Sequence, residues 1–138
     1  MRNKINILMI LSCMVLFQAC TKSDSTNSTS SNVLNGTWHW VSTDGGIGNN
    51  IHLTPASTGD SITLVINNNQ YAQQKNGILI SNGTFSISSQ NCIHTATSKS
   101  WLDFSDPAME DMMVENMTVL ELVLSDENMD GLATTYKK

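Results

Sequence analysis

The sequence predicts an all-β fold, a small up-and-down antiparallel β-barrel of eight or nine short strands. Apolar and polar residues alternate with a period of two in several short segments, and turn residues such as Asn76 and Gly77 separate these segments. No long stretch has the 3.6-residue apolar period of a surface helix. A meander of that many strands is expected to curl and close, because closure removes unpaired strand edges.

The first twenty residues have the build of an export signal. Arg2 and Lys4 precede an apolar run over residues 7–17, and the small residue Ala19 lies directly before Cys20. A helix needs about 20 apolar residues to span a membrane, and this run is about half as long. A retained transmembrane helix is therefore the weaker interpretation.

This order of charge, apolar run and cysteine resembles the signal peptide of a bacterial lipoprotein, in which the cysteine is acylated and becomes the new N-terminus. The resemblance implies a signal peptide over residues 1–19 and acyl chains such as palmitate on Cys20. Several chains would anchor the protein permanently in a membrane. Thr21 follows the cysteine where an acidic residue would favour the inner membrane. The expected location is thus the cell envelope, at the outer membrane rather than the inner. The alternative is an ordinary secretory signal that leaves Cys20 unmodified.

Residues 21–32 read TKSDSTNSTSSN, with Ser or Thr at eight of twelve positions and no apolar side chain. Such a segment buries too little to offset its ordering entropy. We therefore expect residues 20–32 to form an acylated, flexible tether and residues 33–138 to form the folded domain. Removing residues 1–19 leaves 119 of the 138 residues, which is room for one domain.

Charge argues against a nucleic-acid-binding protein, and cysteine content argues against a domain stabilised by internal disulfides. All 12 acidic residues but only five of the seven basic residues follow Ala19, so the mature part has a formal charge of −7. Nucleic acid is an unsuitable partner, because binding it requires clustered Lys and Arg. Cys92 would be the one cysteine left beside the acylated Cys20, so no internal disulfide is expected.

The folded part reads as strands from its start. Trp38 and Trp40 alternate with their neighbours, which puts both indoles on the core-facing side of a first strand. Residues 42–60 are rich in Gly, Asn, Ser and Thr, and they predict a long loop. Further strands are expected at residues 62–67, 70–75, 78–80 and 84–88, with a hairpin turn at 76–77 and a second turn or a bulge at 82–83.

The second half of the domain is less regular. Short strands are expected at residues 92–97 and 101–105. In residues 106–116, Asp106 and Pro107 are suited to the start of a short helix, whereas the favoured alternative is a strand from Met112 to Asn116. The last strands are expected at residues 119–124 and 132–137, with a turn at 128–131 between them.

Four segments, in order, resemble the small lipocalin-like domain of Gram-negative lipoproteins: LNGTWHWVST, LTPASTGDS, NGILISNGTFSI, and LVLSDENMDG with the final TYKK. The resemblance covers residues 34–138. Gly36, Thr37 and Trp38 match the Gly-x-Trp signature that opens the first lipocalin strand. The resemblance implies that Gly36, Trp38 and Lys137 form the structural plug of the closed end, with Lys137 in the place of the usual Arg.

An eight-stranded barrel is just wide enough inside for side chains or one small ligand. All five methionines of the mature part follow Ala108, and methionine suits permissive apolar sites. The candidate ligand-binding residues are Trp40, Phe85, Phe104, Met112 and Met117. The alternative is that these side chains fill the core and leave no cavity.

Other chemistry is sparse, and the sequence predicts no enzyme, cofactor or metal site. Asp126 opens a segment similar to a calcium loop, but Lys137 stands where that loop needs a bidentate Glu. The three histidines have no local ligand spacing, and there is neither a nucleophile elbow nor a phosphate-binding loop.

Two functions remain. The first is a membrane-anchored lipocalin-like lipoprotein that binds a small apolar or amphipathic ligand. The second is a packed β-barrel that serves as an accessory or interaction module of the cell envelope, without a ligand cavity. The sequence leaves the ligand and the oligomeric state open.

Overall fold

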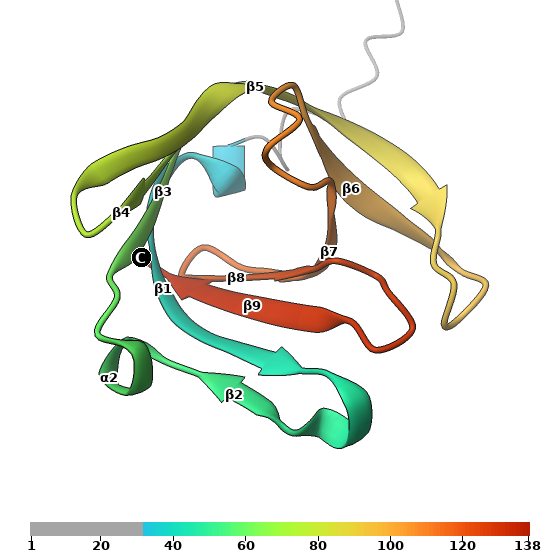
Figure 1. Cartoon of the computed structure of the whole chain (residues 1–138). Coiled ribbons are helices and arrows are strands. Elements are labelled where there is room, and N and C mark those ends of the chain that lie inside the picture. The colour runs from blue at the N-terminus through green and yellow to red at the C-terminus, as the bar shows by residue number, and fades with distance from the viewer. Residues whose placement is uncertain (1–31) are drawn as a thin grey trace, which may run out of the picture.

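Eight antiparallel strands close into a barrel, and one additional strand lies beside the first (Figure 1). The structure is a computed structural model that describes residues 32–138. Closure results from β1, which pairs with β3 along one edge and with β9 along the other. The strands are β1 (Gly36–Gly45), β2 (Ile51–Leu53), β3 (Ile62–Asn67), β4 (Gln70–Lys75), β5 (Ile78–Asn91), β6 (Ser98–Phe104), β7 (Met112–Met117), β8 (Glu121–Ser125) and β9 (Leu132–Lys137). The predicted all-β barrel is confirmed.

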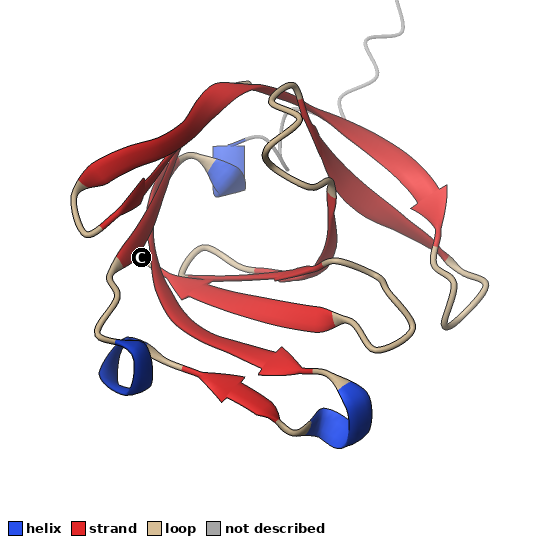
Figure 2. Cartoon of the chain, viewed as in Figure 1, coloured by secondary structure: helices blue, strands red, loops and turns tan. Residues whose placement is uncertain are grey.

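Helix is confined to three short pieces in the described part of the chain (Figure 2). One turn covers residues 32–34, η1 (Ile47–Asn49) follows β1, and α2 (Pro55–Thr58) precedes β3. None of the helices between residues 32 and 138 is long and apolar enough to cross a membrane. The predicted signal peptide, Cys20 and nearly all of the predicted tether lie outside the described residues.

The long loop predicted for residues 42–60 is wrong over most of this range. The segment instead forms the end of β1, a short helical turn, β2 and α2. β1 continues to Gly45 because its second half pairs with β9, and β2 folds back onto that same half. Thr54 and Ser57 form a capping box at the start of α2, and Gly59 ends the helix with a φ of 75°. Polar residues supply these caps and ladder pairs, so apolar alternation does not reveal them.

The hairpin turn between β4 and β5 is confirmed. Asn76 and Gly77 have φ values of 53° and 78°, which a tight hairpin turn requires. The second turn or bulge was predicted at residues 82–83, but β5 runs through this position without a break. The bulge lies at Ile80, where the register of β4 and β5 shifts.

Residues 92–97 form a turn between β5 and β6, so the strand predicted there was wrong. The carbonyl of Thr97 accepts the N–H of Cys92 at 2.8 Å, and the carbonyl of Cys92 accepts the N–H of Ala96 at 3.1 Å. These local bonds use backbone groups that a strand would offer to a neighbour.

The strand interpretation of residues 106–116 is confirmed, since β7 begins at Met112. The segment before it is a turn in which the carboxylate of Asp106 accepts the N–H of Ala108 at 3.0 Å. β8 begins at Glu121, two residues later than predicted.

The barrel interior is packed around the two predicted tryptophans. Trp38 is fully buried and Trp40 is 6% exposed, which confirms that both indoles point into the core. The pleat of β1 explains this, because alternate side chains of a strand lie on one face. The buried apolar cluster comprises Leu34, Trp38, Trp40, Leu64, Ile66, Tyr71, Phe85, Leu102, Leu122, Leu124 and Tyr136.

Candidate functional site

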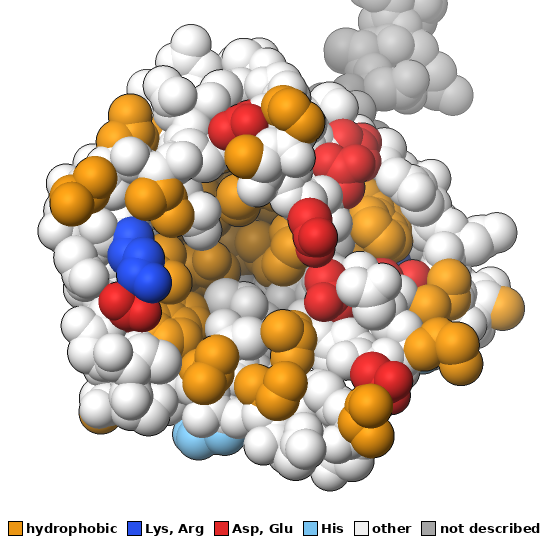
Figure 3. Space-filling model, in the orientation of Figure 1, with side chains coloured by type: hydrophobic (Ala, Val, Ile, Leu, Met, Phe, Trp, Pro, Cys, Tyr) orange, Lys and Arg blue, Asp and Glu red, His pale blue; other side chains and the backbone are white. Residues whose placement is uncertain are grey.

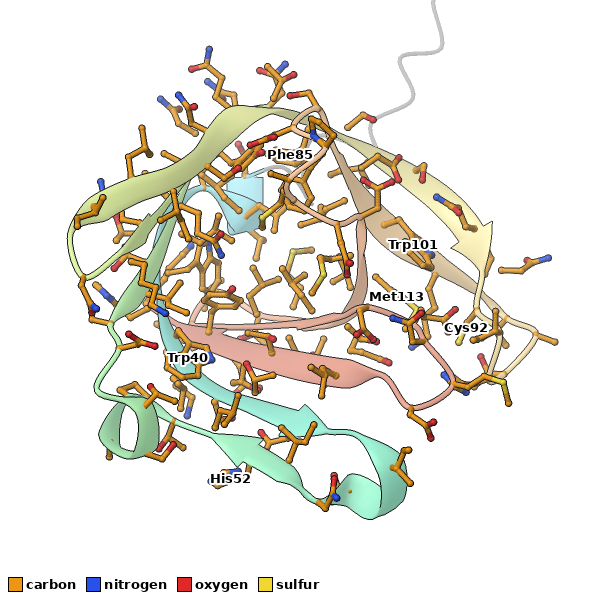
Figure 4. The ribbon with its side chains drawn as sticks, viewed as in Figure 1. Trp40, His52, Phe85, Cys92, Trp101 and Met113 are labelled. Carbon is orange, nitrogen blue, oxygen red and sulfur yellow. The ribbon has the colours of Figure 1, made fainter. Side chains whose placement is uncertain are left out.

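The five predicted ligand-binding residues all belong to one apolar cluster in the barrel. Figure 4 places Trp40 on β1 and Phe85 on β5, at different sides of the ring of strands. These two residues are buried, and the other three are partly buried and pack against the same cluster: Phe104, Met112 and Met117. The predicted set is therefore brought together on the inner wall, which is a position from which side chains can contact an enclosed ligand.

Aromatic rings form one side of this wall. The ring centroids of Tyr71 and Phe104 lie 4.7 Å apart with an interplanar angle of 69°, and those of Phe85 and Phe104 lie 6.1 Å apart. Aromatic pairs in edge-to-face or tilted geometry stabilise the fold in addition to the burial of their rings, and they favour particular ring orientations. One aromatic ring from each of β4, β5 and β6 thus packs into a single aromatic group on this side of the interior.

The face of the molecule in Figure 3 is hollowed at its centre, and hydrophobic side chains line the hollow. Figures 1 and 3 share one orientation, so the hollow lies over the barrel interior. The side chains inside the barrel therefore do not fill its cross-section completely at this face.

Polar atoms inside the barrel are mostly partnered. The indole Nε1 of Trp40 donates to Oγ1 of Thr43 at 3.0 Å, and Thr43 and Thr134 share a hydrogen bond of 3.1 Å. Burial raises the pKa of Tyr136 to about 12, while a hydrogen bond with Gln73 acts in the opposite direction. The interior thus favours neutral groups.

A hydrogen-bond relay holds the β6–β7 loop against the barrel. Oη of Tyr71 lies 2.9 Å from Oγ of Ser81, and that hydroxyl donates to Oδ2 of Asp106 at 2.7 Å. The bond from Ser81, with one from the N–H of Ala108, holds the pKa of Asp106 below its usual value. The relay contains no histidine or lysine that would act as a base, and its role is to position the loop.

The plug at the start of β1 uses Lys138, not the predicted Lys137. Nζ of Lys138 lies 4.3 Å from the Trp38 ring centroid and donates to the carbonyls of Val33 at 2.9 Å and Asn35 at 2.7 Å. Lys137 instead faces Glu121, with Nζ and Oε2 3.8 Å apart. Tyr136 points inward, so alternation along the chain turns residue 137 outward and residue 138 inward.

Trp38 and Gly36 of the predicted plug both lie at the start of β1. Nε1 of Trp38 donates to the carbonyl of Leu34 at 2.7 Å. Gly36 has a φ of 136°, and a Cβ at this position would lie 2.8 Å from Cε of Lys138. A larger residue at position 36 would therefore displace the lysine from the indole.

A cavity of about 320 Å³ lies where β6 and β7 separate. The ladder between these strands has two register pairs, Trp101 with Met113 and Leu102 with Met112. The lining is half apolar and half polar: Leu34, Ile87, Leu102, Val114 and Met117, with Ser98, Lys99, Ser100, Glu115 and Asn116. Sequence reasoning missed all of these except Met117, because alternation does not report where two neighbouring strands diverge.

The five methionines do not all line one site. Met109, Met112 and Met117 pack against the interior cluster, Met113 is fully buried outside that cluster, and Met129 is 88% exposed. The methionine-rich half of the chain therefore contributes three side chains to the interior, not five.

Cys92 is buried beside a carboxylate. Its thiol donates to Glu127, which also accepts the N–H of Ile93 at 2.9 Å. Burial acts to raise the pKa of Glu127, but the hydrogen bonds from Cys92, Ile93 and His94 and the charge of His94 together leave the pKa below its usual value. The contact between the thiol and the carboxylate joins the turn after β5 to the turn after β8.

His52 and the segment from Asp126 make local polar contacts. His52 pairs with Asp44, and the side chain of Asp126 accepts the N–H of Leu132 at 2.9 Å within a turn. Across residues 32–138, no group of three or more His, Cys, Asp or Glu side chains is placed to hold a metal ion.

Comparison with family models, with curated proteins and with solved structures gave no match to this chain. The likeness to lipocalins therefore rests on the closed eight-stranded barrel and on the sequence segments that resemble that family.

Proposed function

We propose that this chain is a membrane-anchored, lipocalin-like lipoprotein that binds one small apolar or amphipathic molecule in its barrel, and that it is not an enzyme. The observation that carries the proposal is the hydrophobic hollow at the centre of the barrel face (Figure 3). Ligand sites are concave, mostly apolar and largely preformed. Aromatic and methionine side chains around this hollow supply that environment.

The anchoring part of the proposal rests on the sequence alone. Two cations, an apolar run and Cys20 follow one another as in a lipoprotein signal peptide. Acylation of Cys20 would hold the barrel at the cell envelope, at the outer membrane rather than the inner, with residues 21–32 as the tether.

A fluorescence titration with a fatty-acid analogue tests binding by the interior. The protein without residues 1–22 is titrated alongside two variants, Met112→Trp, which adds bulk to the interior, and Met129→Trp, which adds the same bulk at an exposed position. We expect the affinity to fall at least tenfold in the first variant and to stay unchanged in the second. Equal affinities in all three proteins would contradict binding inside the barrel.

One observation favours the second function, a module that captures another envelope protein. Ile78, Leu79 and Ile80 are consecutive, and their exposed fractions are 70%, 53% and 50%. A run of exposed apolar residues is unusual on a protein without partners. If this run binds a protein, a pull-down in detergent returns one stoichiometric partner, and the Leu79→Ser variant loses it.

A further inference from the structure

The barrel wall is incomplete between β6 and β7. The two strands share only two register pairs, so residues 98–100 of β6 and 114–117 of β7 face the gap without pairing across it. We call this gap the β6–β7 seam. Leu34 and Leu102 line the cavity at the seam and also belong to the interior cluster. The seam is therefore a side opening that borders the apolar interior.

A β-bulge aims one carboxylate across the seam. The register of β7 and β8 shifts between Val114 and Asn116, which makes Glu115 the extra residue. Val114 and Met117 both pack toward the interior, whereas Oε2 of Glu115 lies 3.5 Å from Nζ of Lys99 on β6. Bulges often re-aim a side chain beside a functional site.

The ion pair at the seam is loosely held. The side chains of Lys99 and Glu115 are 34% and 40% exposed, and exposed pairs contribute little net stability. A second anion could displace Glu115 at small cost and form a charge-assisted hydrogen bond with Lys99. Lys99 is the cation that lines this cavity.

The other lysines of the described chain lie elsewhere and have partners. Nζ of Lys75 is 2.8 Å from Oδ2 of Asp60, Lys137 pairs with Glu121, and Lys138 covers Trp38. Recognition of an anion at this cavity, beside its apolar lining, therefore falls to Lys99.

The cavity volume limits the size of the ligand. At about 320 Å³ it lies at the lower end of the range of roughly 300–1,000 Å³ for small-molecule pockets. Its apolar lining includes Ile87, Leu102, Val114 and Met117. This space suits a single alkyl chain better than a lipid with two chains.

We propose that the β6–β7 seam binds a single-chain fatty carboxylate, with Lys99 recognising the carboxylate, Glu115 competing for that lysine, and the alkyl chain lying on the apolar lining. This inference rests on the proposed ligand-binding function, and it names the ligand class and the place where the head group lies. Apolar burial supplies affinity, and the lysine selects the charge of the head group.

Calorimetric titration with three probes of equal chain length tests the proposal: decanoate, decanol and decylammonium. We expect the wild-type protein to bind decanoate at least tenfold more tightly than decanol, and decylammonium no better than decanol. Lys99→Gln should remove the preference for decanoate and leave the decanol affinity unchanged. Glu115→Gln should raise the decanoate affinity severalfold, because the competitor is lost.

Lys137→Gln and Glu121→Gln are matched controls. They remove the same charges from an exposed Lys–Glu pair outside the cavity lining. Glu121→Gln keeps a side-chain oxygen for the 3.1 Å bond from Nδ2 of the lining residue Asn116, so both variants report long-range electrostatics. We expect both controls to keep the wild-type affinities. Ile87→Trp, at a partly exposed lining position, should weaken decanoate and decanol alike by at least tenfold, which locates both probes at the seam.

The outcomes separate this inference from the function on which it rests. If the three probes bind equally well and Lys99→Gln changes nothing, the barrel is a ligand binder but the assignment of Lys99 is overturned. An equal loss in Lys99→Gln and Lys137→Gln, or a preference for decylammonium, overturns it as well. If the wild-type protein binds none of the probes, both the proposed function and this inference fail.

Discussion

Burial of the Tyr136 phenol couples the stability of the barrel to alkaline pH. Its pKa is about 12 in the folded protein against an ordinary value of 10, so folding favours the protonated form. That contribution is fully present below pH 10 and is lost as the pH rises from 10 to 12. Two pKa units correspond to roughly 3 kcal/mol.

We therefore expect the free energy of unfolding, measured by urea titration across this pH range, to fall more steeply for the wild-type protein than for Tyr136→Phe. The lysines deprotonate in both proteins and cancel in the comparison. Parallel pH profiles would contradict the buried, protonated phenol.

Lys138 closes the plug through its ammonium group. It lies over the Trp38 ring and donates to two backbone carbonyls, so Lys138→Ala should destabilise the fold by about 1 to 2 kcal/mol. Lys137→Ala is the neighbouring control and should cost less than about 0.5 kcal/mol, because its exposed pair with Glu121 is weak. Equal losses in chemical denaturation would refute the assignment of the plug to residue 138.

The proposed membrane anchoring depends on acylation of Cys20. We expect Cys20→Ser to abolish incorporation of labelled palmitate in cells and to move the protein from the membrane fraction to the soluble fraction. Cys92→Ser serves as the control, because Cys92 lies buried in the folded domain and should leave labelling intact. Continued labelling of the Cys20 variant would refute the lipoprotein proposal.

At the scale of the elements, the relay from Tyr71 through Ser81 to Asp106 fixes the β6–β7 loop. Because the pKa of Asp106 is held below its ordinary value of 3.8, its carboxylate stabilises the fold above that pH. This contribution is lost as the pH falls through the lowered pKa. We expect Asp106→Asn to flatten the acid limb of a stability profile measured between about pH 5 and pH 2. An unchanged acid limb would show that the relay does not couple the loop to the barrel.

Local signals predicted the regular strands well. β3, β4 and β9 begin and end where alternation and turn residues placed them, because each carries its own apolar face and bounding turn. The strand predicted at residues 92–97 was wrong because backbone groups of Cys92, Ala96 and Thr97 bond to one another within a turn, which side-chain alternation does not report. β2 and α2 were missed because caps and pairing with β1, not apolar periodicity, determine them.

The position of a candidate site residue could be predicted where it follows from the alternation of side chains along a strand. The inward position of Trp40 follows from alternation along β1, and all five candidate residues contribute to the interior cluster. Met112 and Met117 are five residues apart, so strict alternation would put them on opposite faces, and the bulge at Glu115 brings both to the interior. The seam was not predictable. It depends on a bulge at Glu115 and on a ladder of two pairs, both of which arise from tertiary packing that a single sequence does not encode locally.

At the scale of the whole molecule, closure of the sheet determines what the inner faces of the strands can do. Closing β1 on β9 satisfies the backbone edges there, so the inner faces of the strands are free to line an apolar space. The remaining opening in the wall, at the β6–β7 seam, carries the Lys99–Glu115 pair. The fold thus combines an apolar interior with a charged pair at the β6–β7 seam.

Native mass spectrometry of the freshly purified protein without residues 1–22 tests the central claim most directly. We expect a reproducible additional mass, of the size of one single-chain amphiphile, that leaves on collisional activation while the barrel stays folded. A bare mass that persists after incubation with decanoate would contradict the account of this barrel as a ligand binder.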